Sequence, residues 1–176
     1  MAFVLGSGLT GADWDFGHEG ASIVGLWRFK FLSEGNLTSA GIPDGAVLDQ
    51  GYSAWHSDGT EIMNSGRDPL TGSFCLGAWK QTGRSSFKLS HYAMNWSGLT
   101  VDAKGNVILD PKTKQPLNVL IGPSNISENV TVDGDRDSFQ GTFTIENYDP
   151  LGKVLIRLTG KVTAVRLTAD SPGFVQ

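Results

Sequence analysis

Cysteine and histidine are scarce in this 176-residue chain, and long apolar runs are missing. The single cysteine, Cys75, excludes an internal disulfide bond. The three histidines, His18, His56 and His91, match no recognised zinc spacing, so we expect neither a metal nor a cofactor. No apolar run reaches the length that crosses a bilayer, and no glycine-rich loop between a strand and a helix indicates a nucleotide site.

Clusters of basic residues are absent as well. The formal net charge is -4, and no stretch of Lys and Arg offers a surface for phosphate backbones, so nucleic acid is not an expected partner. The opening residues MAFVLGSGLTG lack the basic start and long apolar core of a secretory signal. With only one cysteine, this pattern predicts a cytoplasmic protein without a membrane anchor.

Glycine, β-branched and aromatic residues are abundant, and they predict an all-β protein. Twenty-three glycines and seven prolines separate short runs rich in Val, Ile, Thr, Phe and Trp, and no convincing amphipathic helix is visible. Turn signals such as Asp58-Gly59 indicate that consecutive strands pair as neighbours. The predicted strands cover residues 24–32, 47–57, 60–66, 73–81, 85–96, 117–122, 126–133, 137–148 and 153–167.

A series of antiparallel hairpins removes its exposed sheet edges most simply by closing into a barrel. We therefore predict a single antiparallel up-and-down β-barrel of eight to ten strands over residues 23–176. Residues 1–22 are rich in glycine and only loosely patterned, which is typical of a loop or a flap over one mouth of the barrel.

Strand parity indicates which side chains enter the barrel. In VGLWRFKFL the aromatic residues alternate with Arg and Lys, so the aromatic face should be inside. If QTGR closes a three-residue loop, Trp79 lies opposite Phe87 and Cys75 lies opposite His91, on the face without charges. Asn95 shares that face with His91. In the last hairpin, the same argument turns Phe143 inward.

The stretch GYSAWHSDGTEIMNSGRDP carries an unusual number of polar side chains. A two-residue turn at Asp58-Gly59 would pair His56 with Glu61 and Trp55 with Ile62. We expect the Trp55 face to be inside, together with Ser53, Asn64 and Asp49. His56 and Glu61 would then form a solvated pair on the surface, while Tyr52 would share their face. A register error of one residue would exchange the two faces.

Two motifs resemble the lipocalin and wider calycin pattern. They are Gly25-Leu26-Trp27 at the start of the first strand, and Arg166 in the glycine-led run GKVTAVRL near the end of the chain. In that family the tryptophan of a Gly-x-Trp motif is covered by an arginine from the last strand. The resemblance implies a calycin-type barrel, and WHSDGTEI followed by GAW is similar to bacterial lipocalin-like domains of poorly known function.

An aromatic-lined barrel with a few inward polar groups is typical of a pocket for a small hydrophobic molecule. The first hypothesis is a cofactor-independent lyase, isomerase or cyclase acting on an aromatic or polyketide-like substrate. Its catalytic residues would be His91, Asn64 and Asn95, and its ligand-binding residues Trp55, Ser53, Asp49, Tyr52, Trp79 and Phe143.

The second hypothesis is a binding or carrier protein without catalysis, and a third is a structural domain whose interior is filled by side chains. His91 could equally be a core histidine satisfied by a neighbouring carboxylate or carbonyl. Cys75 is expected to be a small buried residue. The sequence leaves a homodimer open.

Overall fold

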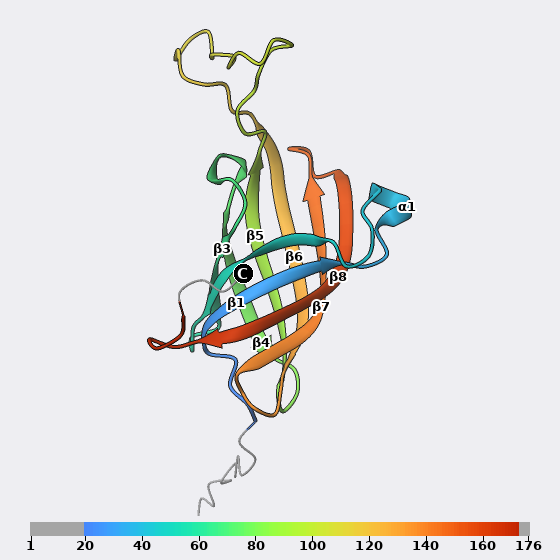
Figure 1. The fold of residues 1–176 in the computed structure, drawn as a ribbon, viewed down its shortest axis with the longest axis vertical. Coiled ribbons are helices and arrows are strands. Elements are labelled where there is room, and N and C mark those ends of the chain that lie inside the picture. The colour runs from blue at the N-terminus through green and yellow to red at the C-terminus, as the bar shows by residue number, and fades with distance from the viewer. Residues whose placement is uncertain (1–19, 173–176) are drawn as a thin grey trace, which may run out of the picture.

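The computed structural model describes residues 20–172, and it contains eight β-strands joined by hairpins and loops (Figure 1). One four-residue helix, α1 (Leu37–Ala40), and one short 3-10 turn, η1 (Pro69–Thr71), interrupt the strand order. The strands are β1 (Gly25–Ser33), β2 (Val47–Trp55), β3 (Thr60–Ser65), β4 (Phe74–Gln81), β5 (Ser86–Trp96), β6 (Leu120–Val132), β7 (Ser138–Tyr148) and β8 (Val154–Leu167). The region predicted as an N-terminal flap, residues 1–22, lies almost entirely outside the described residues.

The strands form one closed antiparallel barrel in the order of the sequence. Each strand pairs with the next, and β1 pairs with β8 to close the sheet, so the predicted up-and-down barrel is confirmed. Closure satisfies the backbone hydrogen bonds that the edge strands of an open sheet would expose. Figure 1 shows β1, β2 and β8 crossing the barrel obliquely, and the connection between β5 and β6 projecting beyond one end.

The prediction of separate strands at 117–122 and 126–133 is wrong, because both belong to β6. Pro123 lies within this strand, opposite Met94, and an irregularity in the pairing follows between Asn95 and Trp96. Proline is tolerated in a strand beside such a bulge, since its missing N–H then breaks no regular pair. Gly122 and Pro123 therefore lie beside a bulge within one continuous strand.

The barrel interior is aromatic at one end. Trp27, Phe29 and Phe31 are buried on the inner face of β1, as their alternation with Arg28 and Lys30 predicted. The Phe139 ring lies 4.9 Å from Trp27 and 6.0 Å from Trp55, measured between ring centroids. These rings, with Phe87 and the half-buried Trp79, fill that end of the lumen.

Arg166 covers Trp27, as the Gly-x-Trp pattern predicted. Its guanidinium carbon lies 4.1 Å from the centre of the indole ring, and its two terminal nitrogens donate hydrogen bonds to the carbonyls of Val24 and Ser22 at 2.7 Å each. Gly25 has a φ of 143°, and a Cβ at this position would lie 2.6 Å from the guanidinium. The glycine of the motif is therefore required both by the backbone and by the arginine.

Two hairpins are shifted by two residues from the predicted register. Gly77, and not Cys75, lies opposite His91 in the β4–β5 pair, and Gly160 lies opposite Phe143 in the β7–β8 pair. The loops are longer than assumed. Because side chains alternate with a period of two, this shift leaves every residue on its predicted face.

Candidate functional site

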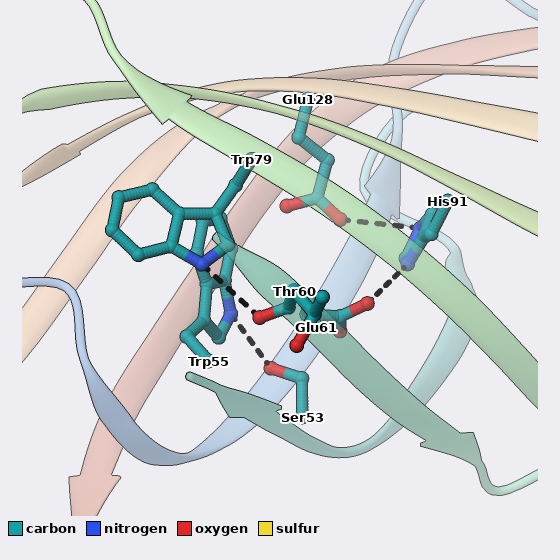
Figure 2. Close-up of polar contacts among 7 residues, drawn as sticks. All are labelled: Ser53, Trp55, Thr60, Glu61, Trp79, His91 and Glu128. Carbon is teal, nitrogen blue, oxygen red and sulfur yellow. Dashed lines mark hydrogen bonds and ion pairs between the residues drawn. The ribbon is translucent and has the colours of Figure 1, made fainter. Parts of the chain in front are cut away.

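A buried histidine between two glutamates is the main cluster of ionisable groups inside the barrel. Nδ1 of His91 lies 3.3 Å from Oε2 of Glu61, and Nε2 lies 3.4 Å from Oε1 of Glu128 (Figure 2). All three side chains are at most 4% exposed. The contact with Glu61 is a hydrogen bond, whereas the one with Glu128 has the distance of an ion pair without hydrogen-bond geometry. We call these three residues the triad.

The triad depends on strand register and on one glycine. Glu61 of β3 pairs with Gly77 of β4, which pairs in turn with His91 of β5, so Gly77 separates the two polar side chains. A Cβ at Gly77 would lie 2.5 Å from Oε2 of Glu61 and 3.0 Å from Cβ of His91. The missing side chain therefore allows the carboxylate to reach across β4 to the imidazole.

The prediction that Glu61 forms a solvated surface pair with His56 is wrong. Glu61 is buried and His56 is exposed, because the loop between β2 and β3 has three residues and not two. The His56 carbonyl accepts a hydrogen bond from the Gly59 N–H, and the His56 N–H donates to the Thr60 carbonyl. Gly59 has a φ of 88°, as expected for a turn that is followed by a left-handed glycine.

This extra loop residue moves β3 by one position and exchanges its faces. Glu61 and Met63 point inward, while Ile62 and Asn64 point outward. Asn64 was predicted to lie inside the barrel as a catalytic residue, and this placement is wrong. The predicted inner and outer faces of β2 are confirmed. Ser53 and Trp55 are buried on the inner face, and Tyr52 lies on the outer face beside Asn64.

The electrostatics of the triad favour proton exchange near neutral pH. Burial disfavours a charged His91, but the hydrogen bond to Glu61 and the negative charges of both glutamates outweigh burial and raise the pKa of His91. Burial also raises the pKa of Glu128 to about 7, although the charge of His91 acts in the opposite direction. A histidine whose charged form is favoured by two neighbouring carboxylates thus lies beside a carboxyl group that titrates near pH 7.

Two polar atoms of the triad have no hydrogen-bond partner among the described residues. They are Oε1 of Glu61 and Nε2 of His91, and both are buried. An unpaired buried polar atom is costly, and such atoms commonly mark the position of a water molecule or a ligand atom. The triad therefore offers one acceptor and one ring nitrogen to a group inside the barrel.

The predicted aromatic residues border the triad. The indole N–H of Trp55 donates to the hydroxyl of Ser53 at 3.2 Å, and that of Trp79 donates to the carbonyls of His56 and Thr60 at 3.1 Å each (Figure 2). The two indole rings lie 5.9 Å apart. Phe143 is also buried, and it stacks on Phe31 at 4.5 Å.

A second polar cluster lies on the inner face at the other end of the barrel. The carboxylate of Asp49 accepts hydrogen bonds from the Ser65 hydroxyl at 2.7 and 2.8 Å, and burial raises the pKa of Asp49. Asn95 is buried, as predicted, and its amide donates to the Ser124 hydroxyl. Asn95 lies four residues from His91 on one strand, which is about 13 Å at 3.3 Å per residue, so the two cannot hold the same atom.

Tyr52 and Asn64 line an open pocket of about 970 Å³ on the outer face of the barrel, together with Arg28, Lys30 and Gln50. None of its lining residues belongs to the triad. Because the chemistry-bearing groups are inside, the size of this outer pocket gives no reason to place a reaction there.

Sequence reasoning missed Glu128. The sequence contained a signal for it. Every second residue from 126 to 132 of β6 lies on the inner face, and these residues are Ile126, Glu128, Val130 and Val132. A carboxylate at an apolar position of that pattern indicates a buried ionisable group. Cys75 is buried as predicted, and burial raises its pKa to about 12, which argues against a nucleophilic role.

No family model matches the chain, and no curated protein matches it. Within residues 20–172, no group of three or more His, Cys, Asp or Glu side chains is arranged to hold a metal ion. In the same part of the chain, no helix is long and apolar enough to cross a membrane.

Proposed function

We propose that this barrel is a cofactor-independent enzyme of the lyase, isomerase or cyclase type, which acts on a small hydrophobic substrate by acid–base chemistry. The observation that carries the proposal is the buried triad of Glu61, His91 and Glu128, with two unpaired polar atoms. We further propose that the chain is a calycin-type, lipocalin-like barrel, a proposal supported by its closed eight-stranded sheet and by the packing of Arg166 on Trp27.

In the proposed reaction Glu61 is the base and His91 the acid. The unpaired Oε1 of Glu61 would accept a proton from a carbon beside a substrate carbonyl, and the protonated imidazole would stabilise the negative charge that develops on the carbonyl oxygen. Glu128, with a pKa of about 7, would hold the proton that restores His91. In an isomerisation, Glu61 returns the proton to another carbon of the substrate. In an elimination, the leaving group departs with its bonding electron pair and takes up the proton from Glu61, which restores the base.

A substrate would lie on the inner face between the triad and the second polar cluster, and side chains there would have to move to admit it, because the unpaired atoms of the triad are fully buried. The inward positions there include the small residues Gly51, Ser53, Cys75, Ala93 and Ser124, together with the larger Met63. Barrels of eight strands are just wide enough to hold one small ligand when their inward side chains are small. The aromatic rings next to the triad would contact the apolar part of the substrate, and Asn95 would meet a polar group at its far end.

A binding protein without catalysis is the second candidate. It is favoured by one observation: the ring of His91 is fully buried, and each of its nitrogens lies beside a carboxylate. In this case the triad would only determine the net charge of the barrel interior around the bound ligand.

One experiment separates the two functions. The purified protein is incubated with a metabolite extract, and bound and released molecules are identified by mass spectrometry. An enzyme converts its substrate, and both His91→Gln and Glu61→Gln abolish conversion while the barrel still melts cooperatively. A binding protein returns its ligand with unchanged mass and unchanged chromatographic retention, whereas an isomer formed by the enzyme has the same mass and a different retention time.

The matched control is His56→Gln, because His56 lies on the same hairpin as Glu61 but is exposed. It should convert substrate at the wild-type rate. Full activity in His91→Gln would remove the triad from the mechanism.

A further inference from the structure

One outer face of the barrel is apolar. Six large side chains on β3, β4 and β5 point outward and are between 38% and 60% exposed: Ile62, Phe74, Leu76, Tyr92, Met94 and Trp96. We call these six residues the apolar face. Taking about 200 Å² for a large side chain that is fully exposed, they leave on the order of 600 Å² of surface in water, the upper end for a monomeric protein.

The register shows that these side chains form one continuous surface. Ile62 lies opposite Leu76, and Leu76 lies opposite Tyr92, so the three form a row across three strands. Met94 follows two residues after Tyr92, on the same side of β5, and it lies opposite Pro123 of β6. Side chains at directly opposed positions are about 5 Å apart, which leaves no polar gap within the row.

Among residues 20–172, the outward positions of β4 from Phe74 to Ala78 and of β5 from Ser90 to Trp96 carry no charged side chain, and Arg67 and Asp68 lie in the loop before β4. On β4 and β5 the first outward charges are Lys80 and Lys88, which lie opposite each other toward the far end of the hairpin. Burying the centre of the apolar face would therefore desolvate no ion of β4 or β5, and the lysines would remain at the rim. Depletion of charge in the centre of a patch is typical of the core of a protein interface.

The connection from Ser97 to Val119 extends this apolar surface. It begins directly after Trp96 and projects beyond the end of the barrel (Figure 1). Leu99, Val101, Val107 and Leu109 on this connection are between 42% and 52% exposed. With them the available area rises above about 800 Å², the amount that each partner buries in a typical stable interface.

We propose that the apolar face binds the same face of a second copy of this chain, so that the protein is a symmetric homodimer. Together with the connection, the area matches one half of a standard dimer interface, and the apolar centre of the surface resembles the interfaces of permanent homodimers. The exposed charges of the connection, at Asp102, Lys104 and Lys112, would lie at the rim. Two-fold symmetry brings identical apolar patches together and closes the assembly at two chains. An added peptide strand is a poor occupant, because the closed barrel has no unpaired edge.

Sedimentation velocity and light scattering on the full-length chain test the proposal. The wild type should have twice the chain mass of 18.8 kDa at micromolar concentration. Leu76→Glu should weaken dimerisation by about 30-fold or more, the effect of losing an interface hot spot. Leu155→Glu is the matched control, since Leu155 is an outward leucine of similar exposure on β8, away from the apolar face.

Circular dichroism establishes that each variant is folded, and Tyr92→Glu replaces Leu76→Glu if the latter is not. A folded monomer for the face variant beside a dimeric Leu155→Glu supports the proposal. A monomeric wild type at high micromolar concentration overturns it and assigns the face to an unlike protein or to a terminal segment of the chain. Equal dissociation of the face variant and the control also overturns it.

Discussion

Glu128 should make the protein less stable as the pH rises. Burial raises its pKa from 4.5 to about 7 in the folded protein, so the folded state binds a proton more tightly than the unfolded state. Stability therefore falls between about pH 4.5 and pH 7, where the folded barrel has to accept a buried negative charge. At about 1.4 kcal/mol per pH unit, the titration of Glu128 lowers the free energy of unfolding by on the order of 3 kcal/mol.

His91 acts in the same direction at higher pH. Its pKa is raised above 6.5 in the folded protein, so its contribution to stability is complete below that value. This contribution is lost as the pH rises through the folded pKa, because the imidazole then leaves its two glutamate partners without a counter-charge. The two groups together predict that the free energy of unfolding declines from about pH 4.5 to pH 7 through Glu128 and declines further above pH 6.5 through His91.

Urea unfolding followed by tryptophan fluorescence at several pH values measures this decline. Glu128→Gln keeps the size of the side chain but cannot titrate, so it should remove most of the slope between about pH 4.5 and pH 7. Glu34→Gln is the control, because Glu34 is an exposed surface carboxylate that pairs with Lys161. If Glu128→Gln retains the wild-type slope, the assignment of the buried proton to this residue is refuted.

The other predictions concern packing and reactivity. Trp27→Ala should lower the free energy of unfolding by about 3 to 5 kcal/mol, and Arg166→Ala should lower it by less. An unchanged melting temperature for Trp27→Ala would contradict the role of the Gly-x-Trp motif. Gly77→Ala should cost about 1 to 3 kcal/mol and flatten the pH dependence, whereas Gly134→Ala, where a Cβ meets nothing within 4 Å, should do neither. Cys75, with a pKa of about 12, should resist iodoacetamide at neutral pH until the protein is unfolded, and rapid alkylation of the native protein would be evidence against its burial.

The sequence was sufficient for the barrel and for the position of His91. Alternation of aromatic and basic residues fixes the inner face of β1, and the pair Lys80 and Lys88 fixes the outer face of the β4–β5 hairpin. Loop lengths there were misjudged, but a shift of two residues preserves parity, so His91 still points inward. The face of the sheet on which a residue lies is therefore easier to predict than its partner on the next strand. The alternation of side chains in the sequence fixes the face, whereas the partner also depends on the exact length of the loop.

The β2–β3 hairpin shows the opposite case. Asp58-Gly59 is compatible with a two-residue turn and also with a three-residue loop that ends in a left-handed glycine, and local propensity does not distinguish them. In the structure Thr60 bonds to Asp58 through both its N–H and its hydroxyl, which supports the longer loop. That single added residue brings Glu61 inside and moves Asn64 to the surface.

The three side chains of the triad come together because of this loop and because of contacts between strands that belong to different hairpins. With the two-residue turn, Ile62 would face His91, and the imidazole would keep only Glu128 beside it. With the observed loop, Glu61 reaches His91 only because Gly77 stands between them without a side chain. Two separate backbone features, the three-residue loop and Gly77, therefore agree on placing a second carboxylate in the core, at a cost in desolvation that packing does not require. A side chain that is expensive to bury, and that depends on such agreement, is more readily explained by the proposed acid–base role than by stability alone.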